Sequence, residues 1–151
     1  MDCLLDTNIL LRALDRHHQQ YRTVRRAIIV LRRQGHGLFL TSQNLIEFWA
    51  VATRPVDSNG LGMSIRWTLA QVLMMKRLFQ LLPETAGILG EWERLVTDQQ
   101  VSGKKVHDAR LVAVMTLYRI THILTFNMRD FTRYPGITAI HPRDASVVPT
   151  P

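Results

Sequence analysis

Short apolar segments that alternate with amphipathic helical segments constrain this fold more than any other feature of the sequence. Residues 3–5, 37–41, 122–125 and 137–140 are apolar runs bounded by turn-forming or polar residues, which is typical of buried strands. Helical periodicity fills most of the chain between them. Strands that alternate with helices form a parallel or mostly parallel sheet with helices on both faces. We therefore predict an α/β fold with a central sheet of about four to five strands.

The segments between the strands repeat apolar residues at helical spacing and end at capping or breaking residues. We expect helices at residues 8–15, 19–33, 42–53, 64–80, 84–97 and 106–119. Ser42 or Asn44 is the expected cap of the third helix, and Ser64 is that of the fourth. Residues 55–63 are the most loop-like stretch and the best candidate for a mobile flap, and residues 81–83 are a short strand or a connector.

Length and composition limit the class of protein. The 151 residues fit one domain, which we expect to span residues 1–140, followed by a tail, 141–151, whose three prolines predict fraying. The single cysteine, Cys3, cannot form an internal disulfide, which suits a reducing compartment. Asp2 and Asp6 interrupt the N-terminal apolar run, so we expect no signal peptide. No apolar run reaches the roughly 20 residues of a membrane helix, so we expect a cytoplasmic protein without membrane contact.

The chain is strongly basic, with a formal net charge of +7, and 16 of its 19 basic residues are arginine. Arginine binds phosphate groups in a bidentate manner, so this balance favours a phosphate-rich partner such as a nucleic acid. A basic surface that only keeps the protein in solution is the alternative, and composition does not decide between them.

Four acidic residues occupy comparable positions beside the predicted strands. Asp6 follows the first strand, Glu47 lies on the helix after the second, Asp108 opens the helix before the third, and Asp130 follows the third. Ligands bind at the carboxyl ends of strands in open α/β sheets, where all four acids can gather. Two unit charges 4 Å apart interact by about 4 kcal/mol at an effective dielectric of 20, so such carboxylates take up protons or bind a cation. Oxygen ligands favour Mg²⁺ or Mn²⁺, and no His or Cys set has zinc spacing.

Each acid also has a purely structural interpretation. Asp6 could cap the helix that follows it, and Glu47 and Asp108 could interact with the dipoles of their own helices. Asp130 could stabilise a turn together with Asn127. The sequence leaves these interpretations open.

Hydroxyl and amide residues accompany the acids and favour a site. Thr7 and Asn8 follow the first acid directly, Thr125 and Asn127 lie at the end of the third predicted strand, and Ser42 follows the second. Such groups hold carboxylates or metal-bound waters in place, as metal sites require.

Residues 4–10, 41–47, 107–111 and 124–131 together resemble the PIN-domain ribonucleases, and most closely the VapC-type toxins of bacterial toxin–antitoxin pairs. These segments read LLDTNIL, TSQNLIE, HDARL and LTFNMRDF, occur in the order of the family, and extend the resemblance over about residues 1–140. The resemblance implies a PIN-like α/β/α sandwich and a metal-dependent endoribonuclease. The residues that match the acidic quartet of the family are Asp6, Glu47, Asp108 and Asp130, and those that match its supporting polar positions are Asn8, Ser42, Thr125 and Asn127.

Many relatives carry an acid where this chain has Asn127, so whether Asn127 or Asp130 is nearer the metal stays open. The resemblance further implies that the quartet holds one or two Mg²⁺ or Mn²⁺ ions, which activate a water against an RNA phosphodiester. The candidates for contact with the RNA backbone are Arg22, Arg25, Arg26, Arg110, Arg129 and Arg133.

Two partners besides RNA follow from the resemblance. One is a cognate antitoxin protein that wraps the toxin and reaches into the acidic pocket, and the other is a second copy of the chain in a homodimer. The helix predicted at 64–80 carries more apolar residues than one buried stripe needs, including Trp67, Met74 and Met75. These residues belong either to the core or to a partner surface.

Other enzymes on similar sheets fit the sequence less well. A haloacid-dehalogenase-type phosphatase needs a second aspartate at the position of Asn8, and a receiver domain needs paired acids beside its first strand, whereas Asp2 and Asp6 straddle it. A P-loop needs glycine at the position of Asp98. The remaining alternative is a non-catalytic PIN-like module that binds RNA or protein. Its mark would be a lost acid, and all four acids are present.

Overall fold

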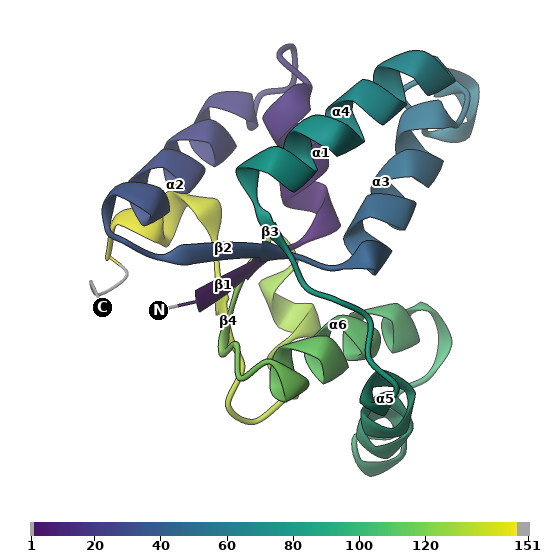
Figure 1. Ribbon diagram of the computed structural model, residues 1–151, viewed down its shortest axis with the longest axis vertical. Coiled ribbons are helices and arrows are strands. Elements are labelled where there is room, and N and C mark those ends of the chain that lie inside the picture. Colours follow the sequence, from purple (N-terminus) through teal and green to yellow (C-terminus); the bar gives the residue numbers. More distant parts are fainter. Residues whose placement is uncertain (1, 148–151) are drawn as a thin grey trace.

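The computed structural model describes residues 2–147 and follows the predicted alternation of strands and helices (Figure 1). The strands are β1 (Asp2–Leu5), β2 (Gly37–Leu40), β3 (Gln80–Leu81), β4 (His122–Leu124) and β5 (Thr138–Ile140). The α-helices are α1 (Thr7–Leu14), α2 (Tyr21–Arg33), α3 (Ser42–Thr53), α4 (Ile65–Leu78), α5 (Gly87–Asp98) and α6 (Val106–Leu117). Short 3-10 helices are η1 (Val56–Ser58), η2 (Gly103–Lys105), η3 (Met128–Asp130) and η4 (Pro142–Val147).

The five strands form one parallel sheet in the order β3-β2-β1-β4-β5. The chain builds outward from β1 through β2 to β3, and then continues on the other side of β1 with β4 and β5. The strand order therefore reverses between β1 and β4, and ligands of open α/β sheets bind at the carboxyl ends of the strands at such a point. Asp6 follows β1 and Thr125 follows β4, so both lie at this switch point.

Helices cover both faces of the sheet, which confirms the predicted α/β/α sandwich. Figure 1 shows α1 to α4 on one side of the strands and α5 and α6 on the other. Side chains alternate along β1, so Cys3 and Leu5 join the apolar cluster beneath α1 to α4, and Leu4 joins the cluster beneath α5 and α6. Burial raises the pKa of the Cys3 thiol to about 12, which suits a core residue rather than a reactive one.

The N-cap of α3 is Thr41, and not Ser42 or Asn44 as we expected. Thr41 Oγ1 accepts a hydrogen bond from the Asn44 backbone N–H (3.2 Å), and Asn44 Oδ1 accepts one from the Thr41 backbone N–H (2.8 Å). The prediction was wrong because Thr41 has the extended backbone of a cap, whereas Ser42 is already helical. Ser64 caps α4 as predicted, since its hydroxyl accepts from the Trp67 backbone N–H.

The 55–63 loop is tied to the end of α3, in contrast to the flap that we expected. The backbone N–H groups of Leu61, Gly62 and Met63 donate hydrogen bonds to carbonyl groups of residues 51–54. The chain passes so closely that a Cβ atom on Gly60 would lie 1.9 Å from a carbonyl oxygen. Glycine at this position therefore allows the close approach.

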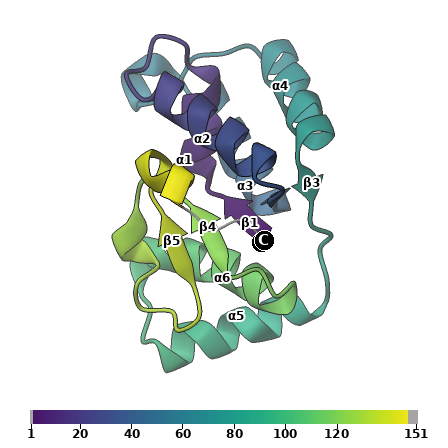
Figure 2. The same cartoon turned by 90° about the vertical axis from the view of Figure 1, so that its left-hand side faces the viewer.

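The segment after β5 also departs from the fraying that we expected. Residues 142–147 form η4, in which Pro142 and Ala145 are buried, and Figure 2 shows this helix beside α2. The side chain of Ala145 joins the core cluster of Ile140, which explains the packing. The last part of the predicted tail, 148–151, lies outside the described residues.

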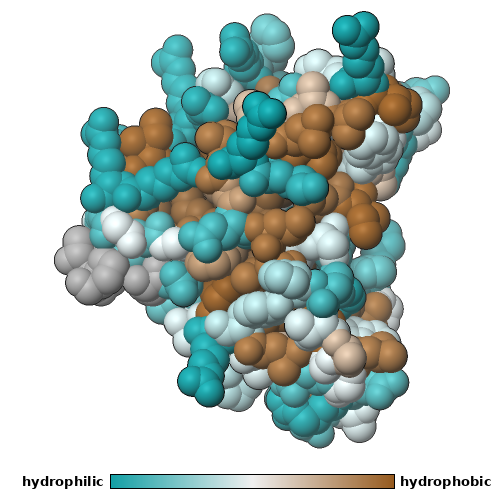
Figure 3. Space-filling view, viewed as in Figure 1, coloured by the Kyte–Doolittle hydropathy of each residue, from teal (hydrophilic) through white to brown (hydrophobic). Residues whose placement is uncertain are grey.

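Helix α4 leaves much of its apolar surface uncovered. Its buried residues are Thr68 and Met75, whereas its exposed apolar side chains are Ile65, Leu69, Leu73, Met74 and Leu78. Figure 3 shows apolar side chains along α4 and over the centre of this face, with hydrophilic side chains projecting around them. Within residues 2–147, no helix combines the length and apolar character needed to cross a bilayer.

Candidate active site

Asp6 is held at the end of β1 by polar groups from α1 and from the residue that follows β4. Its Oδ2 atom accepts hydrogen bonds from Thr125 Oγ1 (2.6 Å) and from Asn8 Nδ2 (2.8 Å). Asp6 occupies the cap position of α1, but its side chain makes no capping hydrogen bond, so the carboxylate faces the switch point instead. Burial raises the pKa of Asp6 above its ordinary value, the hydrogen bond from Thr125 opposes that shift, and the charge of Glu47 adds to it.

Glu47 lies on α3 and is bound through both carboxylate oxygens. Thr7 Oγ1 donates to Glu47 Oε2 (2.8 Å), and Gln43 Nε2 donates to Glu47 Oε1 (2.8 Å). Thr7 accepts in turn from Asn44 Nδ2 (3.2 Å), so the first turns of α1 and α3 are joined at this acid. These contacts give Glu47 specific partners beyond the dipole of its own helix.

Asp108 lies in the first turn of α6, and its pKa is raised to about 6 from an ordinary 3.8. Burial is the largest cause, followed by the negative charges of Asp130, Asp6 and Glu47, while His107 acts in the opposite direction. Neighbouring carboxylates raise the pKa of an acid only when they are close to it. The four predicted acids therefore share one region of negative potential.

Asp130 lies in η3, where its Oδ1 atom is 3.4 Å from Lys105 Nζ. Lys105 ends η2, immediately before α6, and sequence reasoning did not select it. Asn127 contributes through its backbone N–H, which donates to Thr125 Oγ1 (3.0 Å), and it is exposed. The negative charge after β4 therefore comes from Asp130, whose carboxylate acts on Asp108.

Ser42 and Arg110 bind Glu84, which is not one of the four acids. The Ser42 hydroxyl donates to Glu84, and Arg110 forms an ion pair with Glu84 Oε2 (2.8 Å). The hydrogen bond from Ser42, followed by that from Arg110, lowers the pKa of Glu84 below its ordinary value. Arg110 also donates to Gln43 Oε1 (3.3 Å). Sequence reasoning missed Gln43, although it precedes Glu47 by four residues and so shares its helix face.

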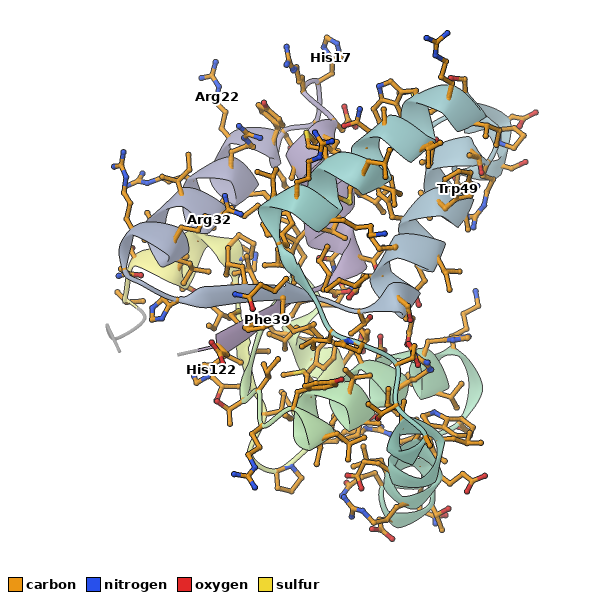
Figure 4. All side chains as sticks on the ribbon, viewed as in Figure 1. His17, Arg22, Arg32, Phe39, Trp49 and His122 are labelled. Atoms are coloured by element: carbon orange, nitrogen blue, oxygen red, sulfur yellow. The ribbon has the colours of Figure 1, made fainter. Side chains whose placement is uncertain are left out.

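The other predicted RNA contacts lie on the surface in two groups. Arg22, Arg25 and Arg26 are exposed on α2, and Figure 4 shows Arg22 pointing away from the body of the molecule. Arg129 and Arg133 are exposed in and after η3, next to Asp130 in the chain. Arg129 and Arg133 are therefore the predicted RNA contacts that lie close in the chain to an acid of the site.

A hollow of about 500 Å³ opens beside Glu47. Its lining residues are Ser42, Gln43, Ile46, Glu47, His107 and Arg110. Of the four acids, Glu47 alone lines this hollow, which gives solvent and ligands access to its side of the site.

Carboxylate oxygens are the ligands that Mg²⁺ and Mn²⁺ prefer, and the donor set here contains four of these groups. Within residues 2–147, no three Asp, Glu, His or Cys side chains are arranged closely enough to chelate one ion as they stand. The residues fit a divalent ion by chemistry and charge, because a cation would offset the negative charges that, after burial, raise the pKa of Asp108.

The sandwich, its strand order and the acids at its switch point together define a PIN-fold protein. The sequence matches the PIN domain family over residues 3–137. The chain therefore belongs to the PIN domain family.

Solved structures with the same fold include proteins of toxin–antitoxin pairs. VapBC of Salmonella typhimurium, in a DNA-bound form, has a TM-score of 0.70 and 16% identity, with 94% of this chain and 98% of that chain covered. A toxin–antitoxin complex of Klebsiella pneumoniae has a TM-score of 0.59 and 21% identity, with coverage of 93% and 97%. VapC20 of Mycobacterium tuberculosis, a toxin that cleaves the sarcin–ricin loop, has a TM-score of 0.57 and 19% identity, with coverage of 80% and 86%. Among curated proteins, none matches this sequence significantly.

Proposed function

We propose that this chain is a metal-dependent endoribonuclease, the toxin of a toxin–antitoxin pair, whose active site is the quartet of Asp6, Glu47, Asp108 and Asp130. The observation that carries the proposal is the set of hydrogen bonds by which Thr125 and Asn8 hold the carboxylate of Asp6 and Thr7 holds that of Glu47. The raised pKa of Asp108, caused by burial and by the charges of the three other acids, agrees with it. Membership of the PIN domain family and the fold shared with toxins such as VapC20 support the same function.

The quartet would hold Mg²⁺ or Mn²⁺. When bound, such an ion lowers the pKa of a water ligand and offsets the negative charge of a phosphodiester in the transition state. Thr125 and Asn8 fix the carboxylate of Asp6, and Thr7 fixes that of Glu47, so these acids meet a ligand in a defined orientation. We assign the orientation of the attacking water to the carboxylates of Asp108 on α6 and Asp130 in η3.

The RNA backbone would approach this site over exposed arginines. Arg129 and Arg133 are the best placed because they flank the segment that carries Asp130. Arg110 contributes to phosphate binding only if it exchanges its ion pair with Glu84 for RNA. Arg22, Arg25 and Arg26 would guide more distant parts of the substrate.

The exposed apolar side chains of α4 support an antitoxin partner. Large contiguous apolar patches on the surface of a soluble protein typically mark sites of interaction with a partner. A hollow of about 150 Å³ between α1, α2 and α4 is lined by Met74 and Leu78 and by Arg25 and Arg32, so it suits an amphipathic segment with acidic residues. Co-purification with the product of the adjacent reading frame tests this partner, and light scattering on the purified chain tests the proposed homodimer.

A PIN-like module that binds RNA or protein without cutting is the second candidate. The observation that favours it is the ion pair between Lys105 and Asp130, together with the lack of a ready three-ligand set within residues 2–147. Cleavage assays separate the two functions directly.

The test is the cleavage of total RNA by the purified chain with Mn²⁺, with EDTA, and with Mn²⁺ restored after EDTA. We expect cleavage that EDTA stops and Mn²⁺ restores, and no cleavage by the Asp6→Asn variant. The matched control is Asp57→Asn, which changes an exposed acid of the 55–63 loop. Cleavage that resists EDTA, or that survives Asp6→Asn, would contradict the proposed site.

A further inference from the structure

The side-chain amide of Gln43 connects Glu47 on α3 to the start of α6, the helix that carries Asp108. Gln43 is one turn before Glu47 on α3, and its side chain is buried, with 8% of the residue exposed. Its Nε2 atom donates to Glu47 Oε1 (2.8 Å) and to the backbone carbonyl of His107 (2.9 Å). His107 directly precedes Asp108, so a single amide group fixes Glu47 relative to the start of α6.

Arg110 determines which way this amide faces. Its Nη1 atom donates to Gln43 Oε1 (3.3 Å), which leaves both N–H bonds of the amide directed at Glu47 and at the carbonyl of His107. A rotated amide would place its oxygen against two acceptor oxygens and its donors against a guanidinium group. The orientation found is therefore the one in which every polar atom of the amide has a complementary partner.

Glu84 completes the set by holding Arg110 in place. Its carboxylate forms an ion pair with Arg110 (2.8 Å) and accepts a hydrogen bond from Ser42, the first residue of α3. Glu84 belongs to the segment between β3 and α5, so this contact links a third part of the chain to α3 and α6. The chain of contacts runs from Glu84 through Arg110 and Gln43 to Glu47.

We propose that Gln43 is a positioning residue of the acidic site, which sets the Glu47 carboxylate relative to Asp108, and that Arg110 and Glu84 orient its amide. The consequence for metal binding rests on the proposed function, whereas the positioning itself does not. Residues that orient metal ligands typically contribute about 10- to 100-fold to metal affinity. Arg110 would then serve the geometry of the site rather than the RNA backbone alone.

The test replaces Gln43 by methionine, which keeps the length of the side chain and removes its hydrogen bonds. We expect Gln43→Met to weaken Mn²⁺ binding about 10- to 100-fold in calorimetric titrations, and Arg110→Met to cause a smaller loss that disappears in the Gln43→Met background. In a Glu47→Gln background, Gln43→Met should change Mn²⁺ affinity little, because its effect passes through Glu47. Gln71→Met on α4 is the matched control and should bind Mn²⁺ like the unmodified chain.

Crystal structures of the metal-free protein provide a readout that does not depend on activity or on metal. In the unmodified chain, Glu47 should keep its contacts with Thr7 and Gln43, and in Gln43→Met its carboxylate should leave this position. Gln43→Met with unchanged Glu47 geometry would overturn the proposal, as would a loss of Mn²⁺ affinity that persists in the Glu47→Gln background. If the unmodified chain binds no Mn²⁺, the proposed function fails, and the two metal-free structures still decide the role of Gln43.

Discussion

The replacement of Asp108 by asparagine should stabilise the metal-free protein at neutral pH. The pKa of Asp108 lies about 2 units above its ordinary 3.8, at about 6, and each unit is about 1.36 kcal/mol of differential interaction. The full shift would amount to about 3 kcal/mol, but the side chain is only partly buried, so solvent screening reduces it to about 1–2 kcal/mol. Asp108 also gains about 0.3–1 kcal/mol from the dipole of α6, which asparagine loses. We therefore expect a net gain of about 1 kcal/mol.

The effect should depend on pH in a defined direction. Because the folded protein raises the pKa of Asp108, folding favours its protonated form. That contribution is fully present below pH 3.8 and is lost as the pH rises through about 6, so the charged acid destabilises the fold at pH 7. The advantage of Asp108→Asn should be greatest above pH 7 and should shrink as the pH falls toward 4.

Urea unfolding followed by circular dichroism, in EDTA at pH 7.5 and at pH 4.5, measures this difference. Asp57→Asn is the matched control because it changes an exposed acid outside the site. If Asp108→Asn is no more stable than the control at pH 7.5, the charged form of Asp108 does not destabilise the fold. A gain that is equal at the two pH values would likewise exclude a raised pKa of Asp108 as its cause.

Three further results can be predicted from contacts and charges of individual residues. Gly60→Ala should destabilise the fold by about 1–3 kcal/mol, because its Cβ would lie 1.9 Å from a carbonyl oxygen. Gly90→Ala should stabilise the fold by about 0.5–1 kcal/mol, because its Cβ would have no atom within 4 Å. Thermal unfolding of the two variants measures both effects. Lys105→Met removes the cation beside Asp130, and titration at low salt should show Mn²⁺ binding up to about fivefold tighter; equal or weaker binding would contradict this effect. RNA affinity, measured by filter binding, should fall steeply with salt, and Arg133→Ala should reduce the slope of log affinity against log salt by about 1; an unchanged slope would exclude a phosphate contact.

The sandwich was predictable because most of its strands and helices have a local sequence pattern. The apolar run that ends at Asp6 and the run at 37–41 are typical of buried strands, and the helical stripes between them need a sheet to cover, whereas the short strand β3 was left open as a strand or a connector. Local patterns predict a segment poorly where tertiary contacts decide whether it is ordered or where a helix begins. The 141–147 segment reads as a proline-containing tail, and it is ordered because Ala145 reaches the core. Residues 84–86 read as helical, yet α5 begins at Gly87.

The four acids of the proposed site could be selected from the sequence because each lies just after a strand or in the first turns of a helix beside one. The groups that orient them were only partly predictable. Thr125 and Asn8 adjoin their acid in sequence or in the sheet, whereas Gln43 gains its role from Arg110, 67 positions away in the chain. Ser42 shows the same limit, since its hydroxyl binds Glu84 rather than an acid of the quartet. Contacts over such separations depend on how α3 and α6 pack, which no local pattern encodes.

Crystals soaked in Mn²⁺ would show whether the four acids form a metal site, because anomalous scattering locates the ion without reference to activity. We expect an anomalous peak at the carboxyl ends of β1 and β4, about 2.1 Å from carboxylate oxygens of Asp6 and Asp108. The same peak should vanish in Asp6→Asn crystals. A saturated soak that leaves this region empty, or that places the ion away from Asp6, would exclude the four acids as a metal site.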